Sequence, residues 1–284
     1  MTLLPKISAR ITALPAILLI SSAASAVAPP VTVTLNPTAD AFVVSASPDS
    51  NYGGAGALSI AAPALAKGQF QTVMRFDAST AASTFNTSFA NARWTIQSAT
   101  LTLQAAFPNN PIFNSSAGGM FGASWMSNTT WVEGTGMPRS PGTTGITFNT
   151  LPTFESAADQ PIGTFAYDGS TTDAATYTLT LARSFLYDLN SGGTAGIRLF
   201  PADTVVAYLF NSTDFPVDAN KPALAITATC LADFNGSGTV TVQDIFDFLT
   251  AWFAASPRAD VNRSGTITVQ DIFDFLTAWF AGCS

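Results

Sequence analysis

Two twelve-residue segments near the C-terminus place oxygen-bearing side chains at matching positions. Residues 233–244 (DFNGSGTVTVQD) and 260–271 (DVNRSGTITVQD) lie 27 positions apart, and both carry such side chains at positions 1, 3, 5, 9 and 12. Position 6 is Gly238 or Gly265, where the backbone can turn sharply. A hard cation prefers six to eight oxygen ligands, and a loop of this length can wrap one ion. The spacing therefore predicts two calcium-binding loops of EF-hand-like geometry.

The expected ligands follow from the loop positions. They are Asp233, Asn235, Ser237, the Thr239 carbonyl, Thr241 and Asp244 in the first loop, and Asp260, Asn262, Ser264, the Thr266 carbonyl, Thr268 and Asp271 in the second. Two carboxylates per loop can neutralise one divalent ion, so we expect structural sites filled by extracellular calcium. A single string of this kind is also typical of a polar turn before a helix. The duplication favours the metal sites, because residues 238–254 and 265–281 differ only at Val240 and Ile267.

Each loop runs into the same amphipathic segment. The apolar residues recur at i, i+3, i+4 and i+7, which predicts one core-facing helical stripe in each copy: Ile245, Phe248, Leu249, Trp252 and Ile272, Phe275, Leu276, Trp279. Four further aromatics, Phe246, Phe253, Phe273 and Phe280, lie roughly a quarter turn from that stripe. A module of about 55 residues has little core to hold them. They are expected either to form an exposed patch for a partner or to cover the rest of the chain.

The paired loop-helix pattern of residues 230–284 resembles dockerins. That resemblance implies a module folded around two calcium ions, which attaches a secreted protein to a cohesin domain on a scaffold or cell surface. The chain departs from common dockerins at position 5, where Ser237 and Ser264 replace the usual Asp or Asn. The resemblance also indicates specificity positions and, since the copies are nearly identical, docking in two orientations related by a pseudo-twofold axis. The expected partner-binding residues are Val242, Gln243, Phe246, Thr250, Phe253, Val269, Gln270, Phe273, Thr277 and Phe280.

The chain has two cysteines, Cys230 and Cys283, which bracket this module. A bond between them would close a loop of roughly 50 residues and contribute on the order of 4 kcal/mol in the chain-entropy model. Zinc would need more ligands, and the chain has no histidine, so the pair favours a clasp over a metal site. The Gly282-Cys283 ending is also similar to a bacterial dockerin variant.

The N-terminus has the pattern of a signal peptide over residues 1–26. Lys6 and Arg10 precede an apolar run at 11–20, and Ala24-Ser25-Ala26 is a small-residue cleavage motif. An uncleaved anchor is the alternative, although the run is short for a bilayer span and contains Pro15. Removal of the segment leaves nine basic and 18 acidic residues, a net charge of −9. Such an acidic, exported chain is expected to be secreted and cell-surface associated, and is not expected to bind nucleic acid.

Residues 27–228 have the pattern of one mainly β domain. Short apolar or alternating runs occur at 31–35, 41–45, 70–76, 99–105, 176–181, 196–200, 205–210 and 223–228. Glycine- and proline-rich turns separate them, and the one expected helical turn is at 182–189. Many short strands with this punctuation predict a jelly-roll-like β-sandwich. The small all-α calcium-binding dockerin would follow at 229–284.

The order of short motifs in this domain resembles DNRLRE domains, β-sandwiches grouped with family 96 carbohydrate-binding modules. The motifs are ADAFV at 39–43, SPDSNYGG at 47–54, VMRFD at 73–77, WVEGT at 131–135 and KPALAI at 221–226. The resemblance implies a carbohydrate-binding or surface module. Stacking on a sugar ring would use Tyr52, Trp94, Trp125 or Trp131, with Arg75 and Asn51 bonding hydroxyls. A tryptophan in a sandwich is, however, more often part of the core.

No catalytic site is expected. The absence of histidine closes the Ser-His-Asp and Cys-His routes. The two glutamates are Glu133, whose expected task is to fix a loop, and Glu155. A lyase using Arg75 with Tyr52 is the remaining enzymatic alternative. We therefore expect a secreted non-catalytic module that binds an extracellular polysaccharide and is tethered by calcium to a cohesin-like partner. A structural envelope or matrix protein is the second hypothesis, and a polysaccharide lyase or hydrolase the third.

Overall fold

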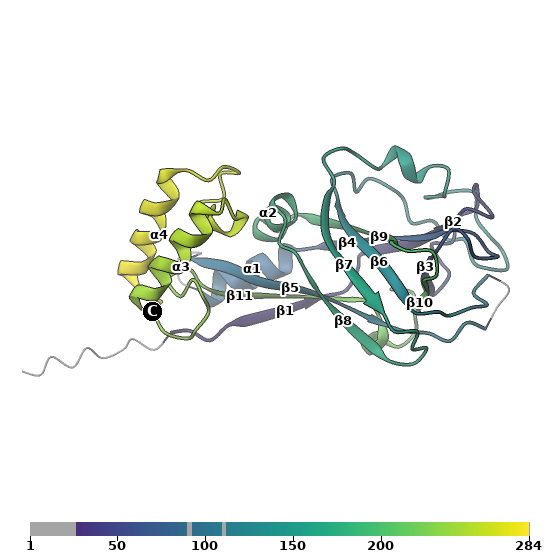
Figure 1. Ribbon diagram of the computed structural model, residues 1–284, viewed down its shortest axis with the longest axis horizontal. Coiled ribbons are helices and arrows are strands. Elements are labelled where there is room, and N and C mark those ends of the chain that lie inside the picture. The colour runs from purple at the N-terminus through teal and green to yellow at the C-terminus, as the bar shows by residue number, and fades with distance from the viewer. Residues whose placement is uncertain (1–26, 90–92, 110–111, 284) are drawn as a thin grey trace, which may run out of the picture.

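The computed structural model describes residues 27–89, 93–109 and 112–283, so the expected signal peptide lies outside the described residues. The chain is mainly β, with two antiparallel sheets that share one hydrophobic core, as in a β-sandwich. The molecule is elongated, and two helices form a separate layer at one end (Figure 1). No helix in the described ranges is long and apolar enough to cross a bilayer.

The first sheet has four strands in the order β1 (Val31–Leu35), β11 (Ala223–Cys230), β5 (Trp94–Gln104) and β8 (Ala174–Leu179). The second sheet has the order β10 (Ala207–Asn211), β3 (Ala57–Ala61), β4 (Phe70–Asp77), β9 (Thr194–Pro201), β6 (Gly119–Met126) and β7 (Gln160–Tyr167), and β2 (Ala39–Val44) also pairs with β4. The chain crosses between the sheets after β1, β4, β5, β7, β8 and β10.

Side-chain alternation along the strands builds two cores in this domain. In β2, Phe42 faces the main core between the sheets, whereas Ala41 faces outward. The long segment between β6 and β7 covers this outer face, and its Trp131, Ile146 and Leu151 are buried against β2 and β4. The segment thus turns the outer side of the β2–β4 pair into a second, smaller core.

Several elements differ from the sequence-based expectation. Strands β3, β6 and β7 and helix α1 (Ser79–Ser88) were not among the predicted elements. Helix α2 (Arg183–Ser191) confirms the helical turn that the sequence predicts at 182–189. It ends at Gly192, whose φ of 72° is the left-handed conformation that favours glycine at a helix C-terminus. Short 3₁₀ turns occur at Leu151–Thr153, Asp218–Asn220 and Pro257–Ala259.

The C-terminal module, residues 230–283, contains α3 (Val242–Phe253) and α4 (Val269–Ala281). Phe248 and Phe275, one from each helix, stack with ring centroids 4.2 Å apart, and Phe234 packs edge-on against both. Each helix begins with a capping box in which a threonine and an aspartate satisfy backbone amides reciprocally. Strand β11 continues through Cys230, so the expected boundary at 228/229 falls inside a strand and the sheet leads directly into the module.

Candidate metal centre

The first loop, residues 233–244, folds back on its own two carboxylates. Asp233 accepts hydrogen bonds from the backbone N–H groups of Ser237 and Gly238, each at 2.9 Å. Asp244 accepts from the N–H groups of Asn235 at 3.3 Å and Thr241 at 2.8 Å. Both carboxylates are buried, although the loop around them is largely exposed. The loop therefore gathers negative charge and oxygen atoms toward its interior.

The second loop, residues 260–271, repeats this geometry. Asp260 accepts from Ser264 at 2.9 Å and Gly265 at 2.8 Å, and Asp271 accepts from Asn262 at 3.4 Å and Thr268 at 2.8 Å. Gly238 and Gly265 both have φ of 83°, which only glycine adopts readily. The sharp turn expected at position 6 is thus present in both copies.

Positions 5, 7 and 9 place further oxygens on each loop. Ser237 donates its hydroxyl to the Thr239 carbonyl at 3.1 Å, and Ser264 does the same to Thr266 at 3.0 Å. The position-9 hydroxyls also cap the helices: Thr241 accepts from the Gln243 N–H, and Thr268 accepts from the N–H of Gln270, both at 3.3 Å. The predicted ligand residues are therefore brought together in two equivalent sets.

Asp247 and Asp274 support the loops and are absent from the sequence-based ligand list. Asp247 accepts from the amide nitrogen of Asn235 at 2.7 Å and from that of Gln243 at 2.9 Å. These bonds stabilise the carboxylate and lower the pKa of Asp247 below its ordinary value. Because Asp247 holds the side-chain nitrogen of Asn235 outward, the side-chain oxygen of Asn235 is directed to the loop. Asp274 holds Asn262 in the same way at 3.0 Å, and the signal was the recurrence of this aspartate in both copies.

The donor set fits a hard cation rather than a transition metal. Each loop offers two carboxylates together with amide, hydroxyl and carbonyl oxygens, which are the ligands that calcium prefers. Since only two carboxylates belong to each loop, no group of three or more Asp, Glu, His or Cys that could hold a metal occurs in the described part of the chain. Calcium could be held by Asp233, Asn235, Ser237 and Asp244, and by their second-loop counterparts.

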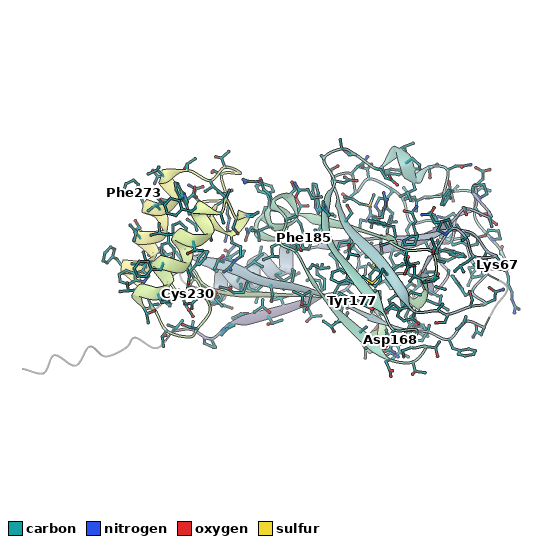
Figure 2. The ribbon with its side chains drawn as sticks, viewed as in Figure 1. Lys67, Asp168, Tyr177, Phe185, Cys230 and Phe273 are labelled. Atoms are coloured by element: carbon teal, nitrogen blue, oxygen red, sulfur yellow. A yellow bond between two sulfur atoms is a disulfide. The ribbon has the colours of Figure 1, made fainter. Side chains whose placement is uncertain are left out.

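The outer faces of α3 and α4 match each other. Phe246 and Phe273 are each 60% exposed, and Phe253 and Phe280 are 78% and 80% exposed. The expected alternative, in which these rings cover the sandwich, is wrong because the sandwich contacts other parts of the module. Val242, Gln243 and Thr250 are exposed with their copies Val269, Gln270 and Thr277. Figure 2 shows Phe273 at the outer end of the molecule and Cys230 where β11 meets the module.

The predicted bond between Cys230 and Cys283 is present, with an S–S distance of 2.00 Å and a Cα–Cα distance of 5.7 Å. It joins the end of β11 to the residue that follows α4 and Gly282. The C-terminus of the module is thereby fixed to the sheet.

Alkylation of the native protein without reduction is expected to label no cysteine, because both thiols are consumed by this bond. Mass spectrometry of the alkylated chain checks this result, and a reduced sample serves as the control that both sites can be labelled. Two labelled thiols in unreduced protein from an oxidising compartment would contradict it.

The aromatic residues expected to stack on sugars are buried. Tyr52 and Trp131 are 3% and 1% exposed, and Trp125 is 8% exposed. Tyr52 stacks on Phe42 in the main core at 4.7 Å. The Trp125 Nε1 donates to Asp188 at 2.7 Å. None of these rings presents an open face in this conformation, so their expected role as a stacking platform is wrong. Tyr52 and Trp125 belong to the main core, and Trp131 belongs to the second core.

Trp94 and Asn51 also have structural roles. Trp94 is 3% exposed, and its Nε1 donates to Asn86 at 2.8 Å. Asn51 is fully buried, donates to the carbonyls of Glu133 and Ile146 at 2.6 and 2.8 Å, and accepts from backbone amides. Asn51 therefore pins the segment that covers the outer face of the sheet.

Arg75 and Tyr52 lie on opposite sides of the second sheet. Arg75 stacks over Trp131 at 5.0 Å and donates to the Thr129 and Trp131 carbonyls at 3.0 and 3.1 Å, whereas Tyr52 packs into the main core. The two cannot act on one substrate as the lyase alternative requires.

Glu133 fixes a loop, as expected, and it leads to a buried carboxyl group. Its Oε1 accepts from the backbone N–H of Asp40 at 2.8 Å. Asp40 is 0% exposed, one of its oxygens accepts from the Thr213 N–H at 2.7 Å, and the other has no hydrogen-bond partner within the described ranges. Burial raises the pKa of Asp40 to about 8, and the charges of Glu133 and Asp214 act in the same direction.

Comparisons with known proteins leave the family open. No known protein-family model matches the chain. No curated protein matches it either.

Proposed function

We propose that the C-terminal module is a dockerin that folds around two calcium ions and attaches a secreted, non-catalytic β-sandwich to a cohesin-like protein on a scaffold or cell surface. The observation that supports this most is the matched pair of exposed helix faces. Four phenylalanines with exposed fractions between 60% and 80% stand at equivalent positions of α3 and α4. A soluble chain rarely leaves such apolar groups open unless they meet a partner. Equivalent faces would accept that partner in two orientations.

The connectivity of the sandwich supports a jelly-roll-like fold for the cargo domain. The sheet β1-β11-β5-β8 is opposed by β4-β9-β6-β7, and the chain alternates between them. Double-sheet jelly rolls have this arrangement. With the motif resemblance to DNRLRE and family 96 modules, we propose an extracellular polysaccharide as the ligand class of the sandwich. Its contacts would come from exposed side chains other than Tyr52, Trp125 and Trp131.

A structural envelope or matrix protein is the second candidate, and one observation favours it. The aromatic rings that would form a sugar platform are part of the core. A sandwich with this role would assemble on the surface without a glycan ligand. The third hypothesis, a lyase or hydrolase, would require acid and base groups other than the separated Arg75 and Tyr52.

Loss of both apolar faces is expected to detach the protein from the cell surface. The test compares Phe246→Ser, Phe273→Ser and the double variant by surface fractionation of the producing cell, in calcium and in EDTA. Each single variant should remain attached because the other face still binds. The released fraction of the double variant should be at least tenfold higher than that of the unaltered chain. Phe107→Ser is the matched control, since Phe107 is 67% exposed on the sandwich.

Retention of the double variant, with α3 and α4 folded, would reject the docking faces. A panel of soluble and insoluble polysaccharides then separates the cargo hypotheses. Binding without release of reducing or unsaturated ends supports a carbohydrate-binding module. Surface attachment without glycan binding favours the structural protein, and product release would make the chain an enzyme.

A further inference from the structure

One difference between the two loops lies where the module meets the sandwich. The loops differ at positions 2, 4 and 8, and position 4 is Gly236 in the first and Arg263 in the second. Both residues have left-handed backbones, with φ of 71° and 60°. Side chains other than glycine rarely adopt this conformation. An arginine retained there needs a compensating contact.

Arg263 makes that contact with the end of the sandwich. Its guanidinium lies 3.9 Å from the centroid of the Trp94 ring. It also donates to the Trp94 carbonyl at 3.2 Å and to the Asn190 carbonyl at 3.5 Å. Trp94 begins β5 and Asn190 lies in the last turn of α2. The second loop is thus seated between a strand and a helix of the sandwich.

The sandwich contributes an arginine to the second loop in return. Arg183, the first residue of α2, donates to the Gly265 carbonyl at 2.8 Å. The N–H of the same glycine donates to Asp260 at 2.8 Å. Gly265 is therefore held from both sides, next to the expected carbonyl ligand of Thr266. The carbonyl of Gly238, its counterpart in the first loop, receives no such bond from any residue of the described ranges.

A third arginine, just before the second loop, bridges the sandwich and Phe234 of the first loop. Arg258 donates to Gln97 at 2.7 Å and to the Phe234 carbonyl at 2.8 Å, and lies over the Phe234 ring at 4.6 Å. The ion pairs found among the described residues do not include Arg183, Arg258 or Arg263. Their guanidinium groups are directed at neutral oxygens and aromatic rings, and so they orient backbone instead of neutralising the calcium-loop acids.

We propose that the sandwich completes the second calcium site: Arg183 and Arg263 are positioning residues that hold residues 260–271 in the binding geometry, so that this loop binds calcium more tightly than residues 233–244. The inference rests on the proposed calcium binding. A loop held in place loses less conformational freedom when the ion binds. By reciprocity, calcium in the second loop strengthens its contact with the sandwich. If repulsion between the guanidinium groups and the ion were the larger effect, the second loop would bind calcium more weakly than the first.

The test is calcium titration calorimetry of the full secreted chain, one loop at a time. In Asp244→Ala, which leaves the second loop, Arg183→Ala is expected to weaken calcium binding by roughly tenfold, within the usual range of coupling between sites. Arg183→Lys should restore much of the affinity, because it keeps a donor. In Asp271→Ala, which leaves the first loop, Arg183→Ala should change nothing. The single variant Arg183→Ala keeps the sequence of both loops. Of its two stepwise calcium-binding constants, only the tighter one should weaken.

Hydrogen exchange gives a second readout that does not depend on affinity. Calcium should slow exchange of residues 183–190 in the unaltered chain and in Asp244→Ala, but not in Asp271→Ala. Equal weakening of both loops, or tighter binding in Arg183→Ala, would overturn the inference while leaving calcium binding intact. Absence of calcium binding from the unaltered chain would reject the proposed function and this inference together.

Discussion

Chelation of calcium is expected to unfold α3 and α4 once the disulfide is reduced. The fully buried core between these helices consists of Phe234, Phe248 and Phe275 with Leu231 and two alanines. A module of about 55 residues is marginal on such a core. Three of the four loop carboxylates, Asp233, Asp244 and Asp271, are buried. Without a cation, their mutual repulsion opposes folding, and with it the binding energy becomes folding energy.

Far-ultraviolet circular dichroism in EDTA and reductant measures this loss, and α1 and α2 of the sandwich should supply the residual helical signal. Added calcium should restore the helical signal of α3 and α4. Asp244→Ala and Asp271→Ala are each expected to lower the calcium stoichiometry from two to one. Full helicity and unchanged thermal stability in EDTA with reductant would refute the metal requirement. An unchanged stoichiometry of two in either variant would reject the ligand assignment.

Replacement of Asp40 by asparagine is expected to stabilise the protein at pH 8 far more than at pH 5. The folded-state pKa of about 8 lies above the ordinary 3.8, so between these values the folded chain keeps a proton that the unfolded chain releases. Stability therefore falls as pH rises through this window. From this group alone the decrease between pH 5 and pH 8 is on the order of 4 kcal/mol. Asparagine has no charge to bury and keeps an acceptor for Thr213.

Denaturant titrations at pH 5 and pH 8 check the expectation. The free energy of unfolding of Asp40→Asn should change less with pH than that of the unaltered chain, so that the two diverge toward pH 8. Asp49→Asn is the matched control, because Asp49 is an exposed carboxylate of the same domain. Parallel pH profiles for Asp40→Asn and the unaltered chain would show that the buried carboxyl group does not titrate in this way.

The loops and their helices could be predicted from the sequence because their information is local. A duplicated twelve-residue spacing specifies turns and helix starts within one segment. Helix α1 could not be found in this way, since its residues (STAASTFNTS) are mostly weak helix formers. Burial of Ala81, Ala82 and Phe85 against the sandwich stabilises it instead. Tertiary packing therefore overrode local propensity.

Strands β6 and β7 could not be predicted from the sequence, because the roles of their residues depend on neighbouring strands. Gly122 lies under the ring of Phe200 from β9, and a Cβ there would meet that ring at 2.6 Å. Pro161 and Gly163 interrupt β7 at an irregular register opposite Ala123 and Ser124. The burial of Trp125 likewise depends on Asp188, 63 residues away. Sequence spacing alone does not reveal such partners, which is why the predicted sugar-stacking role of the buried rings was wrong.

The direct passage of β11 into the module has a mechanical consequence. β11 lies between β1 and β5, and Cys230 at its end is bonded to Cys283 beyond α4. A pull on the outer faces of the helices would reach Cys230 through either end of the module. The load would then run along the axis of β11, where the hydrogen bonds to both neighbouring strands share it in shear. If the module docks as proposed, force would enter the centre of a sheet without passing through a loose linker, so the sandwich would resist extraction by unzipping.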